Sequence, residues 1–127
     1  MSVKVDLDRL ADALADFTFA YLITVGDDYR AHSVAVEPVL TDGVIDVGPA
    51  GGHTRRNLAR HGDVTLVWPP GELGGYTLIV DGTGGPSDDE TPIRIVPNRA
   101  VLHRQPTPDS PAPRPGCGAD CLPLDGR

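Results

Sequence analysis

Short apolar runs, separated by turns rich in glycine, proline and aspartate, occupy most of the chain between residues 19 and 104. The 127 residues include 15 glycines and 13 prolines, which interrupt helices and favour tight turns. Segments of this length and spacing are typical of short antiparallel strands. The chain is long enough for one domain with a modest core. We therefore expect a mainly β fold and not a helical bundle.

The first expected strands lie between residues 19 and 47. FAYLITV at 19–25 is almost continuously apolar, which predicts a strand buried on both faces. RAHSVAVEPVL at 30–40 alternates between two sets of side chains, which predicts a half-buried strand with a bend or an edge at Pro38. Asp42-Gly43 then predicts a hairpin turn into the returning strand VIDV.

The remaining strands are expected at 63–68, 76–84 and 91–104. The last segment fits either two short strands broken near Pro97 or one strand with a bulge. The total is six or seven strands, and an antiparallel barrel closes them most economically because it leaves few exposed edges.

The segment DLDRLADALADF at 6–17 has the spacing of an amphipathic helix. Asp6 is placed to cap its N-terminus. The apolar positions that form one face are Leu7, Leu10, Ala11, Leu14 and Phe17.

The stretch GGHTRRNLARHG at 51–62 gathers positive charge in an acidic chain. The formal net charge is −7, yet three of eleven basic residues, Arg55, Arg56 and Arg60, fall within six positions. A short helix over 53–60, with His53 or Thr54 near its N-cap, would direct unpaired backbone N–H groups outward. Such a helix end binds anions, phosphate above all, and arginine supplies a fork-shaped partner. The alternative is a solvated helix face whose arginines meet only water.

Composition excludes several classes of function. An acidic chain is unsuited to nucleic acid, which requires a basic surface. The sequence contains no apolar run of about 18 residues, so no membrane span is expected. The N-terminal MSVKVDLDRL lacks the apolar core of a signal peptide, so we expect a cytoplasmic protein. Neither a Ser/His/Asp triad nor a pair of carboxylates is evident in the sequence, so nothing in it indicates hydrolytic chemistry.

The pattern of apolar runs stops near residue 105. We therefore expect one domain over 1–104 and an extended or disordered tail over 105–127, where PTPDSPAPRP holds five prolines in ten residues. The two cysteines, Cys117 and Cys121, lie in this tail and cannot complete a four-ligand zinc site alone. A second copy of the chain, or His103, could add ligands; a local disulfide or no site at all are the alternatives.

The order of these features resembles the FMN-binding split-barrel family, the pyridoxamine 5′-phosphate oxidase-like proteins. TRRNLARHGDVTLVW is similar to the family's basic segment, Asn-Leu pair and following strand, and the likeness extends over roughly residues 7 to 104. The resemblance implies a six-stranded antiparallel split β-barrel with an N-terminal helix and a short inter-strand helix. It also implies a homodimer that holds one flavin in each of two clefts at the subunit interface.

Carried over by position, the resemblance implies a cofactor-binding set. The candidates for the cofactor phosphate are His53, Thr54, Arg55, Arg56 and Asn57. The strand end that would run along the ribityl chain and ring comprises Asp46, Val47, Gly48, Pro49 and Ala50. The strand that would pass near the ring edge contributes Ser33, with His32 and Val34 beside it. Trp68 is expected either as an aromatic wall of the site or as a core residue.

The chain departs from the family pattern in ways that bear on function. Thr54 or an arginine stands where many relatives have a phosphate-binding lysine, and no segment matches the C-terminal substrate-binding part of the vitamin-oxidising enzyme. We therefore expect an oxidoreductase that transfers hydride to or from a small molecule, using FMN or the deazaflavin coenzyme F-420. A non-catalytic flavin- or haem-binding or sensing protein is the alternative. No catalytic acid or base is assigned; His32 is the first residue to test, against a purely structural role.

Overall fold

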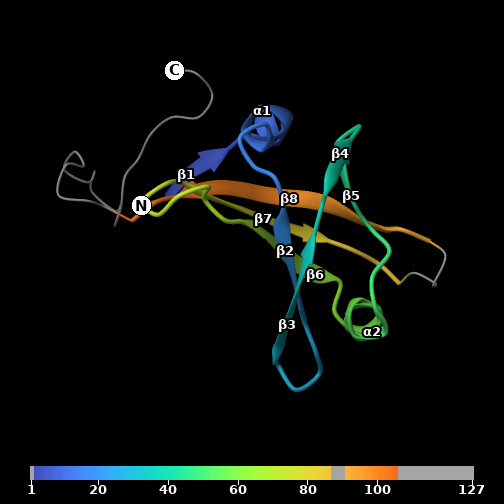
Figure 1. Ribbon diagram of the computed structural model, residues 1–127. Helices are drawn as coiled ribbons and strands as arrows, with labels where there is room; N and C mark the ends of the chain where they lie inside the picture. The colour runs from blue at the N-terminus through green and yellow to red at the C-terminus, as the bar shows by residue number, and fades with distance from the viewer. Residues whose placement is uncertain (1, 87–90, 106–127) are drawn as a thin grey trace.

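The computed structural model describes residues 2–86 and 91–105, which form one antiparallel sheet with helices beside it (Figure 1). The helical elements are a 3-10 helix η1 (Leu7–Arg9), α1 (Leu10–Leu14) and α2 (Gly52–Arg60). The eight strands are β1 (Ser2–Val5), β2 (Ala20–Val25), β3 (Ala31–Val36), β4 (Val39–Thr41), β5 (Val44–Gly48), β6 (Asp63–Trp68), β7 (Thr77–Thr83) and β8 (Ile93–His103).

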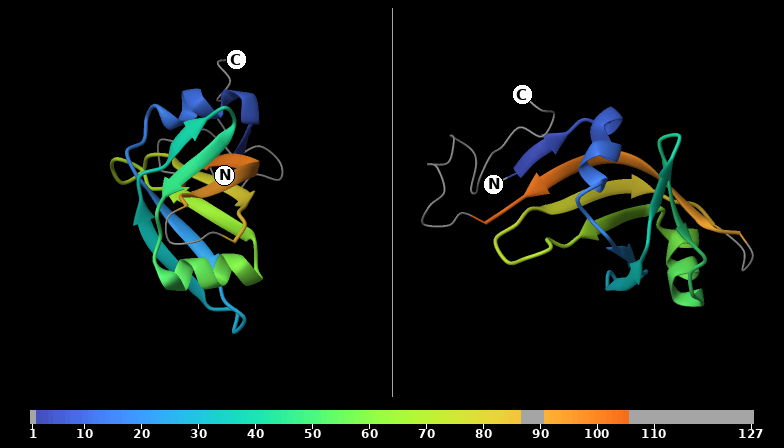
Figure 2. Two further views of the ribbon diagram at one scale, coloured as in Figure 1. Left: turned by 90° about the vertical axis from the view of Figure 1, so that its right-hand side faces the viewer. Right: turned by 45° about the horizontal axis from the view of Figure 1, so that its top comes forward.

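The strands lie in the spatial order β3-β2-β6-β7-β8-β5-β4, and β1 pairs with β8 beside that path. Its two end strands, β3 and β4, follow each other in the chain, but no pairing joins them within the described residues. The curved sheet is therefore an open half-barrel (Figure 2). The mainly β class with two α-helices is confirmed, and the arrangement is consistent with a split barrel.

The predicted number of six strands is wrong, because the described residues form eight. The four-residue β1 is too short for its alternation to stand out in the sequence. The segment 30–40 is divided into β3 and β4 at Glu37-Pro38, where proline has no N–H to donate to a strand ladder.

β2 is buried on one face only. Ala20, Leu22 and Thr24 are fully buried, whereas Tyr21 is 41% exposed and Ile23 is half-buried. The prediction of a strand buried on both faces is therefore wrong for the single chain. The outer face of β2 is also apolar. Together with β3, β6 and β7 it forms a larger apolar surface on the outside of the sheet.

The hydrophobic core is built on the inner face of the sheet. Leu10 of α1 and Leu58 of α2 pack into it from the two helices, at 1% and 2% exposure. Trp68 at the end of β6 is 2% exposed and belongs to the same cluster. Of the two roles expected for this tryptophan, the structure shows the core role.

Two local predictions are confirmed in the β4–β5 turn and in β8. Asp42 and Gly43 have φ of 52° and 80°, the left-handed pair that a two-residue type I′ hairpin requires. In the β7–β8 ladder Asp81 pairs with Arg99 while Gly82 pairs with Pro97, so one extra residue bulges between them. Within the segment 91–104, β8 is therefore one strand with a bulge, and it runs from Ile93 to His103.

The predicted N-terminal helix is present but shorter than expected. It divides at Arg9 into η1 and α1, and α1 ends at Leu14, before the predicted last position Phe17. Asp6 is the N-cap of η1, but its side chain makes no capping hydrogen bond with the described part of the chain. Residues 106–127, which include Cys117, Cys121 and nearly all of the predicted tail, lie outside the described residues. Within the described part, no helix has the length and apolar character needed to cross a membrane.

Candidate functional site

α2 begins shortly after the end of β5, and its N-terminal end lies at the molecular surface. Its N-cap is Gly51, which has extended backbone angles, and its first intrahelical bond runs from Arg55 N to Gly51 O at 3.1 Å. The expected N-cap at His53 or Thr54 is therefore wrong, because the helix starts at Gly52. The N–H groups of Gly52, His53 and Thr54 precede the first intrahelical donor, so this end carries partial positive charge.

Arg56 folds back over the first residue of its own helix. A Cβ placed at Gly52 would lie 3.3 Å from Arg56 Nη1, so the guanidinium stands beside the helix N-terminus. The side chain is exposed, and no carboxylate within residues 2–86 and 91–105 forms an ion pair with it. A permanent positive charge and the helix dipole therefore coincide at this end of α2.

Thr54 contributes a buried hydroxyl in the first turn of α2. The residue is 1% exposed, and its Oγ1 has no hydrogen-bond partner among the described residues. An unsatisfied buried hydroxyl costs roughly 1–3 kcal/mol, which a suitably placed acceptor would recover. The neighbouring Arg55 is half-buried, with its Nε enclosed by protein.

Asn57 fixes α2 on β2. Its Nδ2 donates to Thr24 Oγ1 at 3.0 Å, and both residues are buried. The amide of Asn57 thus points at the sheet and away from the helix N-terminus. Within the predicted phosphate set, this residue positions the helix that carries the other members.

His53 links the start of α2 to β3. Its ring stacks on that of His32, with ring centroids 4.1 Å apart and an interplanar angle of 18°. His32 is the register partner of Thr24, the residue that Asn57 contacts. The first and second turns of α2 therefore lie over neighbouring positions of β2 and β3.

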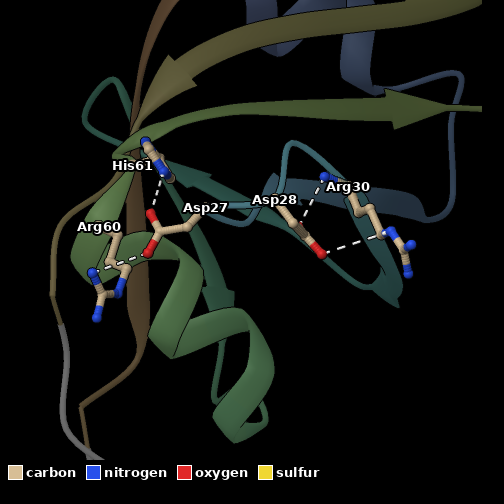
Figure 3. A network of polar contacts seen from close by, with 5 residues as sticks. All are labelled: Asp27, Asp28, Arg30, Arg60 and His61. Atoms are coloured by element: carbon tan, nitrogen blue, oxygen red, sulfur yellow. Dashed lines mark hydrogen bonds and ion pairs between the residues drawn. The ribbon is translucent and has the colours of Figure 1, made fainter.

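The other end of α2 is joined to the β2–β3 turn by one carboxylate (Figure 3). Asp27 Oδ2 lies 3.0 Å from Arg60 Nη1, and Asp27 Oδ1 lies 2.9 Å from His61 Nε2. Asp27 stands in no sequence motif, and no local signal joins it to partners more than thirty positions along the chain. Asp28 and Arg30 in the same turn form a separate pair at 3.7 Å.

The end of β5 leads towards the helix and combines buried and open positions. Val47 is buried, whereas Pro49 is exposed and Ala50 is half-buried. Gly48 has φ of 76°, and its N–H donates to Asp46 Oδ1 at 2.8 Å. This left-handed residue turns the chain out of the sheet towards α2.

A pocket of about 480 Å³ lies beside this strand end. Val47 and Pro49 line it from β5 and the residue after it, and the other lining residues are Phe19, Ala35, Val36 and Glu37. Phe19 and Glu37 were not identified from the sequence, because neither stands in a motif. Ser33 lies on the exposed face of β3, opposite to the face of His32, so one copy of the chain does not bring it to the helix N-terminus.

No family model matches the sequence. Two mycobacterial proteins match nearly all of it: Mb0449c of Mycobacterium bovis and MT0457 of Mycobacterium tuberculosis, both named as uncharacterized. Each is 53% identical over 133 aligned positions, which cover 94% of this chain and 94% of the relative. The chain belongs to the family of these two proteins.

Several solved structures share the fold of this chain. The FAD-binding protein of Mycobacterium smegmatis has a TM-score of 0.60 at 17% identity, covering 80% of this chain and 97% of its own. A protein of Corynebacterium glutamicum, proposed to be a pyridoxamine 5′-phosphate oxidase, has a TM-score of 0.59 at 14% identity, covering 82% and 99%. An FAD-binding protein of Mesorhizobium loti has a TM-score of 0.58 at 11% identity, covering 80% and 96%. The fold is thus that of the FAD-binding and pyridoxamine 5′-phosphate oxidase-like proteins.

Proposed function

We propose that the chain binds a flavin-type cofactor, either FMN or the deazaflavin coenzyme F-420, and uses it as an oxidoreductase on a small molecule. The observation that carries the proposal is the N-terminal end of α2, where the Arg56 guanidinium stands beside Gly52 and the Thr54 hydroxyl has no partner among the described residues. Structural neighbours that are named as FAD-binding proteins support a flavin in general.

A phosphate suits the groups at this helix end. The free N–H groups of the first turn and the helix dipole attract an anion, and Gly52 leaves the approach open because it has no side chain. Arg56 supplies a charged fork-shaped donor. The Thr54 hydroxyl is enclosed by protein in the single chain, and a small shift of the first turn of α2 would let a phosphate oxygen become its acceptor. A hydrogen bond to a charged group contributes about 1.5–3 kcal/mol, enough to dominate recognition of the cofactor tail.

The remaining predicted residues then have distinct roles. Val47, Gly48, Pro49 and Ala50 would border the ribityl chain and ring, because the pocket of about 480 Å³ opens beside Val47 and Pro49. His53 and Arg55 would flank the phosphate, and Asn57 would hold the helix in place through Thr24. When bound, the ring supplies hydride transfer, and the chain's own residues bind and orient it.

The outer face of the sheet supports the proposed homodimer. Ala35, Tyr21, Val67 and Ile79 are successive register partners across β3, β2, β6 and β7, and they form an apolar row. A row of this kind on the surface of a single chain is typical of an interface between subunits. Ser33 lies on this same face, so in a dimer it would approach the cofactor at the interface, where the resemblance places it.

The cofactor is tested by titration of the purified protein. We expect FMN to bind at least about tenfold more tightly than riboflavin, which lacks the phosphate. The same comparison applies to coenzyme F-420 and its deazaflavin core without the phosphate-linked tail. Equal binding with and without the phosphate would remove α2 as the phosphate site, and a lack of binding to all four compounds would remove the cofactor itself.

The oxidoreductase half of the proposal needs a separate measurement. A nicotinamide or deazaflavin donor should reduce the bound flavin, and an added acceptor should reoxidise it in repeated turnovers, followed by absorbance. Tight retention of FMN, or of added haem, without any turnover would replace the enzyme with a binding or sensing protein.

The dimer is tested by light scattering during gel filtration. We expect a mass of twice 13.4 kDa for the native chain. Tyr21→Glu places a charge on the apolar row at a position that is 41% exposed in the single chain, so the fold should tolerate it. We expect this variant to be monomeric; an unchanged mass would show that the row is not the interface.

A further inference from the structure

We propose that a second pocket, separate from α2, binds a small organic cation between an aromatic wall and an acidic rim. The pocket has a volume of about 490 Å³ and lies between α1, the β6–β7 connection and β8. In Figure 1, α1 lies at the top of the view and α2 at the lower right. No described residue lines both this pocket and the proposed cofactor site, so this inference does not rest on the proposed function.

The inner wall of the pocket is apolar. Phe17 and Ala13 line it from the helical side, Tyr76 from the β6–β7 connection and Leu102 from β8. Leu102 belongs to the core, and the other three are partly buried against it. This wall is therefore firmly supported and suits a ligand with a flat or short apolar body. Its volume lies within the range of about 300–1,000 Å³ that small-molecule sites occupy.

The rim of the pocket is acidic. Asp12, Asp16 and Glu72 line it, and none of the other described residues that line it is a lysine, arginine or histidine. Within the described ranges, neither Asp16 nor Glu72 forms an ion pair, whereas Asp12 lies 3.4 Å from Arg9 of η1. Like-signed groups around a concave apolar surface focus their field, so the rim attracts a cation and repels an anion.

Tyr76 already makes one cation–π contact within the chain, with a residue that is not among the described residues lining the pocket. The guanidinium of Arg104 lies over its ring, 4.5 Å from the centroid. The ring thus already takes part in a cation–π contact, the interaction that aromatic walls make with ammonium groups. Among the described residues, the three carboxylates of the rim outnumber the two guanidinium groups of Arg104 and Arg9, so the described charge around the pocket is negative. The ligand class is an amine or quaternary ammonium on an apolar body.

The ligand class can be tested with three small aromatic probes and the full-length chain. Titrations followed by NMR at constant ionic strength would use benzyltrimethylammonium, benzyl alcohol and benzoate. We expect saturable binding of the ammonium, at least about threefold weaker binding of the alcohol, and none of benzoate. Equal binding of the three probes, or a lack of saturation with the ammonium, would overturn the proposal.

Matched variants locate the site. Glu72→Gln removes one exposed carboxylate from the rim and should weaken the ammonium about three- to tenfold. Glu37→Gln makes the same chemical change outside this pocket and should leave ammonium binding unchanged, which separates the local rim from the net charge of the chain. Tyr76→Leu should weaken the ammonium more than benzyl alcohol. Equal losses in the two glutamate variants would overturn the site.

The proposed cofactor function stays distinguishable from this one. FMN affinity of Glu72→Gln should equal that of the native chain, because Glu72 lies outside the proposed cofactor site. Loss of FMN binding together with ammonium binding would contradict two independent sites.

Discussion

Each end of α2 carries an arginine, but the two ends hold it differently. At the C-terminal end, Arg60 and His61 both contact Asp27, and this is the end at which the helix dipole favours cations. At the N-terminal end, where the dipole disfavours cations, Arg56 stands without an ion-pair partner among the described residues. The arginine at the C-terminal end forms an ion pair within the fold, whereas the arginine at the N-terminal end is available to a ligand.

The glycines at the two ends of α2 also differ in how closely other atoms surround them. A Cβ at Gly62, just after α2, would lie 2.6 Å from the carbonyl oxygen of Gly84. Among the described residues, a Cβ at Gly51 would meet nothing within 4 Å, and one at Gly52 would meet only the Arg56 guanidinium. The C-terminal end is therefore packed against other backbone, and the N-terminal end is open.

The largest effect is expected from Gly62→Ala. The added methyl group would meet backbone that cannot move aside easily, so we expect the free energy of unfolding to fall by about 3 kcal/mol. Gly51→Ala should cost less than about 1 kcal/mol, because it only replaces a tolerated N-cap residue. Urea denaturation measures both. Similar losses at the two positions would contradict the contrast between a packed and an open end.

Arg56→Ala should weaken FMN binding about tenfold or more, because one charge-assisted contact contributes about 1.5–3 kcal/mol. Riboflavin binding should not change, since the contact is with the phosphate. Arg60→Ala is the matched control on the same helix and should change FMN affinity less than about twofold. A larger loss of FMN affinity in Arg60→Ala than in Arg56→Ala would show that the phosphate binds at the C-terminal end of α2 and not at its N-terminal end.

Thr54→Val replaces the buried hydroxyl with a group of similar shape. The free energy of unfolding without cofactor should stay the same or rise by up to about 1 kcal/mol, because an unsatisfied polar group is removed. FMN affinity should fall about fivefold, since the phosphate loses one donor. Thermal denaturation and cofactor titration together check this; a loss of stability without cofactor would show that the hydroxyl serves the fold.

Asp27→Asn is expected to have the smallest effect. Its carboxylate is more than half exposed, and exposed ion pairs typically contribute about 0.2–1 kcal/mol. We expect a loss of about 0.5 kcal/mol in the free energy of unfolding and no change in FMN affinity. A marked loss of FMN affinity would mean that this contact positions the phosphate end of α2 as well.

Local patterns predicted much of the fold because they depend on neighbouring residues. The Asp42-Gly43 turn, β6 and the place of α2 all follow from turn residues or alternation within a few positions. The register of β1 with β8 could not be predicted, because it joins residues about a hundred positions apart.

The orientation of the side chains in the candidate site could not be predicted from the sequence. The sequence indicated the segment 53–57, yet it gave no sign that Asn57 faces Thr24 or that the Thr54 hydroxyl is buried. Both facts depend on how α2 lies on β2, which tertiary packing decides. The Asp27 contact was missed for the same reason, since its partners follow more than thirty residues later.

The pairing of β1 with β8 has a consequence for how the chain folds as it is made. Ser2 lies opposite His103 and Val5 opposite Ala100, while the same edge of β8 receives β5 nearer its start. β1 therefore leaves the ribosome about a hundred residues before β8 and must wait for it before it finds its neighbour. Such distant pairing raises the entropic cost of closure and slows folding. We expect nascent chains that end before residue 100 to expose unpaired strand edges and to aggregate.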